Sequence, residues 1–145
     1  MKIPMLFLAD DDPDDRQWFE EALQGLSPVP VVRSFPNGVE LMAALLEPFK
    51  PRPEMIFLDL NMPMMTGEEC LADIRAEPRL SSVPVVVYST HLDPAKVPCL
   101  IELGADRYFE KPLTMDGLGN ELRDCLRQFA VGGTAKGPLE REPVA

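Results

Sequence analysis

The sequence contains little cysteine and no long apolar run, and each shortage argues against a class of protein. Its three cysteines, Cys70, Cys99 and Cys125, are odd in number and widely spaced. They fit neither a disulfide framework nor a zinc-binding pattern, so we interpret them as reduced core thiols of a cytoplasmic protein. No apolar stretch reaches the roughly 18 residues that a membrane span needs, and the first residues lack the pattern of a secretory signal.

Basic residues are also scarce. The 145-residue chain has 14 lysines and arginines against 24 aspartates and glutamates, a formal net charge of -10. Surfaces that bind nucleic acid or anionic lipid need clustered positive charge, so the composition argues against both kinds of partner. An acidic chain with a local group of aspartates, here Asp10 to Asp12, favours a cation site instead. The length and the ordinary apolar content predict one globular domain.

Five short apolar segments alternate with five segments of helical character. We expect strands at residues 3–9, 29–35, 55–59, 83–88 and 107–110. We expect helices after Pro13, over 39–46, after Thr66, between Pro94 and Gly104, and over 113–129. Continuously apolar strands are typical of a parallel sheet that is buried on both faces. The alternation predicts an α/β fold of the flavodoxin-like type, a doubly wound parallel sheet of five strands in the order 2-1-3-4-5 with five helices.

Local signals predict how two of the helices begin. Asp12 is a candidate N-cap with Pro13 in the first turn, and Asp14 and Asp15 suit the positive end of that helix. We interpret these aspartates as a cap and solvated charges rather than as ligands. Pro98 lies near the start of the fourth helix, where its ring conflicts with a regular first turn. That helix is therefore expected to be short, late-starting or irregular.

The predicted topology brings polar side chains to one edge of the sheet. The residues that end or follow the apolar segments there are Asp10, Asp11, Asp59, Ser89 and Lys111. Three carboxylates at one place repel one another, and a hard dication such as Mg²⁺ relieves that repulsion. Asp11, Asp59 and a backbone carbonyl near Asn61 are candidate ligands, and Asp10 would hold a water on the ion. Lys111 and Ser89 would stabilise a transferring phosphoryl group, which the Asp59 carboxylate would attack.

This set of residues resembles one known family. The motifs Asp10-Asp11-Asp12-Pro13, Asp59 within Leu58-Asp59-Leu60-Asn61-Met62-Pro63, Gly67, Ser89 and Lys111-Pro112 are similar to those of the receiver domain of two-component response regulators. The resemblance covers about residues 3–129, and we expect a receiver domain over 1–131 followed by a disordered tail over 132–145. The runs around Asp59 and Ser89 look most like stand-alone receivers that pair with phytochrome-type sensor kinases.

The resemblance implies roles for individual residues. Asp59 would accept a phosphoryl group from a phosphohistidine of a sensor histidine kinase, with Mg²⁺ or Mn²⁺ required. Lys111 would contact the acceptor and precede a cis bond to Pro112. Ser89 would move to meet the phosphate while Tyr108 turns inward. The readout face would be formed by the expected helix between Pro94 and Gly104, the strand 107–110 and the helix 113–129.

The expected function is a phosphorylatable switch that acts by binding a partner protein, without turnover of an outside substrate. A homodimer through the readout face is a further expectation. Ser89 stands where the family more often has threonine, which keeps the hydroxyl, and Pro98 distorts a helix of the readout face. We also hypothesise that Asn61 and His91, each two positions past a site residue, line the entrance to the phosphate and tune its hydrolysis.

Other interpretations remain open. A flavin carrier shares the topology, but it needs a hydroxyl- and glycine-rich phosphate loop where this chain has three aspartates. A phosphohydrolase with an aspartyl intermediate needs an insertion that recognises its substrate, and the connections here are short. A receiver-like module that never meets phosphate would bind its partner regardless of Asp59. In the plainer interpretation, Lys111 is only a structural counter-ion and Tyr108 only a packing residue.

Overall fold

The computed structural model describes residues 3–129 and has the predicted sheet. Its strands are β1 (Met5–Ala9), β2 (Val31–Phe35), β3 (Met55–Asp59), β4 (Val85–Ser89) and β5 (Arg107–Glu110). The helices are α1 (Pro13–Leu23), α2 (Gly38–Leu45), α3 (Gly67–Ala76), α4 (Val97–Leu103) and α5 (Met115–Gln128). All neighbouring strands pair in parallel in the order β2-β1-β3-β4-β5, so the predicted fold class is confirmed.

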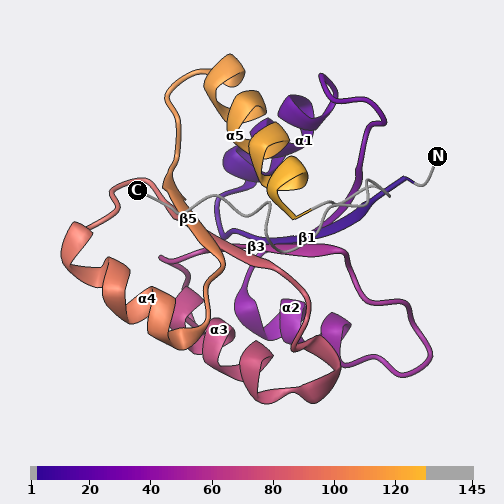
Figure 1. Ribbon diagram of the computed structural model, residues 1–145, viewed down its shortest axis with the longest axis vertical. Helices are drawn as coiled ribbons and strands as arrows, with labels where there is room; N and C mark the ends of the chain where they lie inside the picture. Colours follow the sequence, from indigo (N-terminus) through magenta and orange to yellow (C-terminus); the bar gives the residue numbers. More distant parts are fainter. Residues whose placement is uncertain (1–2, 130–145) are drawn as a thin grey trace.

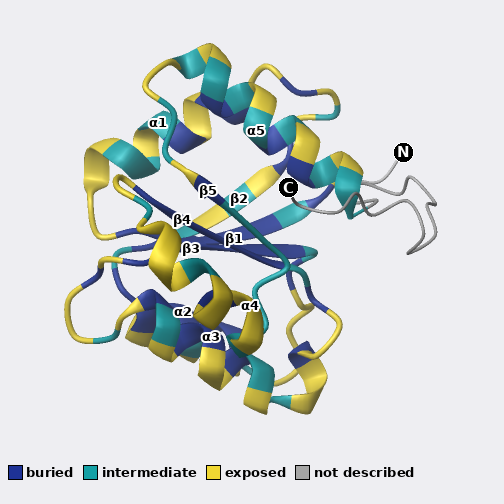
Figure 2. Cartoon of the chain, turned by 60° about the vertical axis from the view of Figure 1, so that its left-hand side comes forward, coloured by how far each residue is buried: buried dark blue, intermediate teal, exposed yellow. Residues whose placement is uncertain are grey.

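Helices cover both faces of the sheet, with α1 and α5 on one side and α2, α3 and α4 on the other (Figure 1). The central strand β3 is buried along its whole length, and its side chains alternate between the two faces. Ile56 and Leu58 belong to the apolar cluster under α2, α3 and α4, whereas Met55 and Phe57 belong to the cluster under α1 and α5. The Phe57 ring packs edge-on against Phe19 of α1, with centroids 5.0 Å apart. Figure 2 shows the largely buried strands β1, β3 and β4 between partly exposed helices, whereas the edge strands β2 and β5 are partly exposed.

Several helix ends follow the predicted local chemistry. The Asp12 carboxylate accepts hydrogen bonds from the backbone N–H of Asp14 at 2.9 Å and of Asp15 at 3.4 Å, so it is the N-cap of α1. Thr66 and Glu69 form a reciprocal capping box at the start of α3. The prediction for Pro98 is confirmed, because a 3₁₀ turn over Pro94–Lys96 precedes an α4 of only seven residues.

Some boundaries and burial predictions were wrong. The second strand begins at Val31 and the fourth at Val85, each directly after a proline that has no N–H to give to a strand ladder. Cys70 and Cys125 are buried as expected, but Cys99 lies exposed on α4. Leu46 lies just past the end of α2 and is 45% exposed. No helix within residues 3–129 is long and apolar enough to span a membrane. The tail expected at 132–145 lies outside the described residues.

Candidate functional site

Four strands deliver polar side chains to one end of the sheet. Asp10 follows β1, Asp59 ends β3, Ser89 ends β4 and Lys111 follows β5. Asp10, Asp11 and Asp59 each offer a carboxylate oxygen, and these oxygens lie within 4.8 Å of one another. The sequence-predicted carboxylates, Ser89 and Lys111 therefore meet at the carboxyl ends of the strands.

The start of α3 packs very closely against the end of β3 beside Asp59. Gly67 begins α3 directly behind β3, and a Cβ there would lie 2.7 Å from the carbonyl oxygen of Asp59 and 2.8 Å from the Cα of Leu60. Its backbone N–H donates to the Leu60 carbonyl at 3.2 Å. Met64, in the loop between them, has a φ of 68° and is 74% exposed. Only glycine lets α3 begin so close to the end of β3, and this contact fixes the backbone beside Asp59.

Asp10 is fully buried, and both of its carboxylate oxygens have partners. One oxygen, Oδ1, accepts the backbone N–H of Asp12 at 3.0 Å. The other, Oδ2, accepts the Tyr88 hydroxyl at 2.6 Å and the Lys111 ammonium at 3.1 Å. Its backbone carbonyl accepts from the Arg16 guanidinium at 2.7 Å. These contacts, together with the hydrogen bond from its backbone N–H to the Phe35 carbonyl at 3.0 Å, fix the position of Asp10 relative to Asp59.

Tyr88 is a site residue that the sequence analysis missed. It is 2% exposed, pairs in register with Asp59 and lies under the Lys111 ammonium, 4.8 Å from the ring centroid. Burial, and then the negative charge of Asp10, hold the pKa of Tyr88 well above its usual range, so its hydroxyl stays a donor at neutral pH. A signal was present, because Tyr88 is the first residue with a polar tip after three consecutive valines.

The Lys111 ammonium is shared among three carboxylates. Its Nζ lies 2.7 Å from Asp15 Oδ2, 3.1 Å from Asp10 Oδ2 and 3.5 Å from Asp59 Oδ2. Burial alone would lower the pKa of Lys111, but the hydrogen bond that its ammonium donates to Asp15 and the charges of Asp10 and Asp59 more than offset it and raise that pKa above its ordinary value. Asp15 is thus an ion-pair partner and not the solvated charge that we predicted. The two residues are 96 positions apart, beyond the reach of local sequence signals.

Asp59 is 3% exposed and lies in an environment that resists its negative charge. Burial, followed by the charge of Asp10, raises its pKa from 3.8 to about 7, while Lys111 and the backbone N–H of Asn61 act in the opposite direction. That N–H reaches Asp59 Oδ1 at 3.2 Å. A divalent cation is the natural counter-charge, because three carboxylate oxygens at this spacing are the donor set that hard dications prefer.

Ser89 is tied to the loops beside the site. Its buried hydroxyl donates to the backbone carbonyl of His91 at 3.3 Å and accepts the Asn61 side-chain amide at 3.1 Å. Only the backbone of His91 enters these contacts, and its side chain lies on the exposed surface. Asn61 therefore contacts both Asp59, through its backbone N–H, and Ser89, through its side-chain amide.

The cis bond expected between Lys111 and Pro112 was wrong, since the cis bond of residues 3–129 joins Ser27 and Pro28. The trans form before proline is favoured by about 0.5–1 kcal/mol in the absence of tertiary constraint, and trans geometry already lets Lys111 reach its carboxylates. Tyr108 lies on β5 with its side chain half-buried against the cluster under α2, α3 and α4. Its predicted switching movement stays a prediction.

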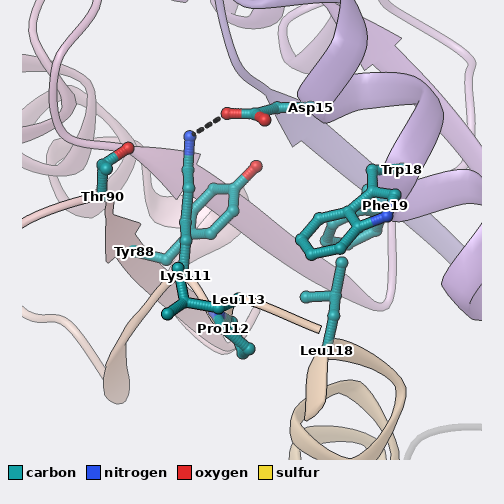
Figure 3. A pocket seen from close by; sticks show the side chains of 9 residues that line it. All are labelled: Asp15, Trp18, Phe19, Tyr88, Thr90, Lys111, Pro112, Leu113 and Leu118. Atoms are coloured by element: carbon teal, nitrogen blue, oxygen red, sulfur yellow. Dashed lines mark hydrogen bonds and ion pairs between the residues drawn. The ribbon is translucent and has the colours of Figure 1, made fainter. Parts of the chain in front are cut away.

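A pocket of about 230 Å³ opens beside the site, between α1 and the segment from β5 to α5 (Figure 3). Trp18, Phe19 and Leu118 supply apolar walls. Asp15 and Lys111 form a polar end, where their ion pair is drawn as a dashed line (Figure 3). The ion pair is therefore bordered on one side by apolar surface.

Comparisons with known proteins point to one family. The family model described as response regulator receiver domain matches residues 6–123. The KDP operon transcriptional regulatory protein KdpE of Escherichia coli is 31% identical over 92% of this chain, but the chain spans only 56% of the length of that relative. The response regulator Rcp1 of Synechocystis sp. is 30% identical, over 79% of this chain and 80% of its own length.

Solved structures agree with this family match. The phosphorylated cyanobacterial phytochrome response regulator RcpA superposes with a TM-score of 0.81 at 29% identity, covering 94% of this chain and 99% of its own. The Mn²⁺-bound form of Rcp1 superposes with a TM-score of 0.77 at 28% identity, covering 93% and 99%. A divalent cation bound to this relative is consistent with the acidic pocket of Asp10, Asp11 and Asp59.

Proposed function

The chain belongs to the family of response regulator receiver domains, and we propose that it is a switch phosphorylated on Asp59 by a sensor histidine kinase. The observation that carries the proposal is a nearly buried carboxylate with a raised pKa at the end of β3, next to Asp10, Asp11 and a lysine ammonium. Such a carboxylate gains from any change that removes or neutralises its charge. A bound dication would do so directly, and together with the Lys111 ammonium it would also offset the additional negative charge of an acyl phosphate on Asp59.

The chemistry is a transfer between two covalent carriers. An oxygen of the Asp59 carboxylate attacks the phosphorus of a phosphohistidine, and a new P–O bond forms as the P–N bond breaks. The electron pair of that bond stays on the imidazole nitrogen, which ends neutral after proton exchange with solvent. The Lys111 ammonium lies 3.5 Å from the attacking carboxylate, so it is near enough to form an ion pair with the phosphoryl oxygens.

Mg²⁺ or Mn²⁺ would be held by Asp11, Asp59 and the backbone carbonyl of Asn61, with Asp10 acting through a water. When bound, the ion supplies positive charge to the phosphoryl oxygens and offsets the repulsion among the carboxylates. The Ser89 hydroxyl is the neutral donor for the same group. It would have to leave the His91 carbonyl, which it now contacts at 3.3 Å.

The output is association with other proteins. We propose that the receiver domain spans 1–131 and that the readout face is formed by α4, β5 and α5, with movement of Ser89 and Tyr108 coupling it to Asp59. A homodimer through this face and a cytoplasmic location are parts of the proposal. RcpA is described as a phytochrome response regulator, which supports a phytochrome-type kinase as the phosphodonor. No turnover of an outside substrate is involved.

Incubation with phosphoramidate and Mg²⁺ tests the proposal directly. We expect the intact mass of the wild type to rise by one phosphoryl group, and we expect no gain for Asp59→Asn, whose amide is a poor nucleophile. Asp124→Asn, an exposed change on α5, serves as a control and should be phosphorylated like the wild type. A phosphoryl group retained by Asp59→Asn, or none on the wild type, would overturn the assignment.

The Asn61 amide is expected to slow loss of the phosphoryl group. The backbone N–H of Asn61 contacts Asp59 and its side-chain amide contacts Ser89, so alanine would remove the side chain beside the acyl phosphate and open a path for water. We expect Asn61→Ala to shorten the lifetime of phosphorylated Asp59 by about two- to fivefold, in line with a lost hydrogen bond of modest strength. The lifetime is measured by mass spectrometry after the phosphodonor is removed.

His91→Ala is the matched control for the Asn61 substitution. Its backbone carbonyl, and not its exposed side chain, contacts Ser89, so this variant should keep the lifetime of the wild type. Equal lifetimes for all three proteins would remove the role of Asn61. A shorter lifetime in His91→Ala alone would assign the effect to the imidazole.

A further inference from the structure

The carboxylate nearest to the Lys111 ammonium is that of Asp15, which does not belong to the candidate metal site of Asp10, Asp11 and Asp59. The ion pair measures 2.7 Å to Asp15, against 3.1 Å to Asp10 and 3.5 Å to Asp59. The first two contacts are hydrogen bonds, whereas the third distance is longer than a good hydrogen bond. The ammonium is thus drawn toward α1 and away from the residue that would carry the phosphoryl group.

The surroundings make this ion pair stronger than one on an open surface. The Lys111 side chain is 13% exposed, and that of Asp15 is 32% exposed. The ring of Tyr88 lies below the ammonium, and the apolar pocket lined by Trp18 borders it on another side (Figure 3). Solvent therefore screens the pair only in part. The backbone of Asp15 is also fixed, because its N–H donates to the Asp12 cap at the start of α1.

We propose that Asp15 is a positioning residue that holds the Lys111 ammonium away from Asp59 before phosphorylation. The inference rests on the proposed function, because it concerns the same transfer to Asp59. Lys111 must exchange its contact with Asp15 for one with the incoming phosphoryl oxygens, and the pull of Asp15 opposes that exchange. The Asp15–Lys111 ion pair therefore slows phosphoryl transfer, so that a donor that contacts Asp15 can change the rate.

Substitution of Asp15 should therefore speed up phosphorylation, which mere loss of structure would not do. With phosphoramidate as the donor and saturating Mg²⁺, we expect Asp15→Asn to be phosphorylated about three- to fivefold faster than the wild type, the range expected for a partly exposed ion pair. Asp15→Ala should also be phosphorylated faster than the wild type. Asp15→Glu, which keeps a carboxylate within reach of Lys111, should return the rate toward that of the wild type.

Asp14→Asn is the matched control, because it removes the same charge from the neighbouring, exposed position in the first turn of α1. Any general gain for an anionic donor from a less acidic surface should appear in both asparagine variants. The rate is measured as phosphorylated fraction against time by intact mass, and unfolding curves establish that each variant is folded. A rate for Asp15→Asn no higher than that for Asp14→Asn would overturn the inference.

The outcomes separate this inference from the proposed function. If the wild type gains a phosphoryl group on Asp59 and the two asparagine variants match it, the receiver function stands and the role of Asp15 is wrong. If the wild type gains none, the proposed function fails and the role of Asp15 fails with it. A faster Asp15→Asn, with the rate restored in Asp15→Glu, supports both.

Discussion

Asp59→Asn is expected to make the metal-free protein more stable than the wild type at pH 8, by about 2–4 kcal/mol, and to have little effect near pH 4. Burial and the charge of Asp10 raise the pKa of Asp59 from 3.8 to about 7. The folded protein therefore binds this proton more tightly than the unfolded chain. The stabilisation is fully present below pH 3.8 and is lost as the pH rises through about 7. Asparagine is neutral throughout and escapes this loss.

Denaturant unfolding in EDTA at a series of pH values measures this effect. The free energy of unfolding of the wild type should fall relative to that of Asp59→Asn between about pH 4 and pH 8, following the linkage of proton binding to folding. Asp124→Asn should show no such divergence, because Asp124 lies exposed on α5. Added Mg²⁺ should stabilise the wild type much more than Asp59→Asn, since the variant lacks one carboxylate ligand. A metal-free Asp59→Asn that is less stable than the wild type at pH 8 would contradict the electrostatic account.

The parts of the site that sequence could predict depend on chain position alone. Strand β3 is apolar up to Asp59, its last residue, so the parallel topology requires the carboxylate to appear at the edge where Asp10 follows β1. Pro98 also acts through local sterics, and it shortens α4 as predicted. In each case a residue type and its distance from the end of an element determine the outcome.

The parts that sequence missed depend on side-chain directions between distant residues. Tyr88 continues an apolar strand, and its hydroxyl becomes important only because register places it opposite Asp59 and within 2.6 Å of Asp10. In the sequence, Asp15 is one of several acidic residues at the start of a predicted helix. Only the folded structure shows that α1 directs its side chain toward Lys111. Such contacts result from packing in three dimensions, and neither periodicity nor residue spacing encodes them.

Arg75 is expected to be the charged residue outside the site with the largest contribution to stability. Its guanidinium donates to the carbonyls of Gly104 at 2.9 Å and Val83 at 3.0 Å, and to the Asp106 carboxylate at 2.6 Å. The same Asp106 oxygen accepts the backbone N–H of Val85 at 2.9 Å. The end of α3 is thereby joined to the C-terminal cap of α4 and to the start of β4.

Replacing Arg75 with alanine should lower the free energy of unfolding by about 2–4 kcal/mol, because the loss removes several charge-assisted hydrogen bonds from groups that are mostly buried. Arg75→Lys should recover only part of this, since a single ammonium does not reproduce the planar fork of the guanidinium. Arg79→Ala is the control, because Arg79 has a half-exposed side chain whose ion pair to Glu77 is long, at 3.4 Å. Its expected cost is below about 1 kcal/mol.

The Arg75 contacts hold one end of α4, a helix of the proposed readout face, while the other end stays irregular. Gly104 has a φ of 109°, and its carbonyl is tied to Arg75, whereas the first turn of α4 follows a 3₁₀ segment and lacks a side-chain cap. Movement of α4 should therefore be confined to its N-terminal half. Hydrogen exchange should show slow amides near Leu103 and Gly104, and Arg75→Ala should speed their exchange. Unchanged exchange of these amides in Arg75→Ala would show that Arg75 does not anchor the helix.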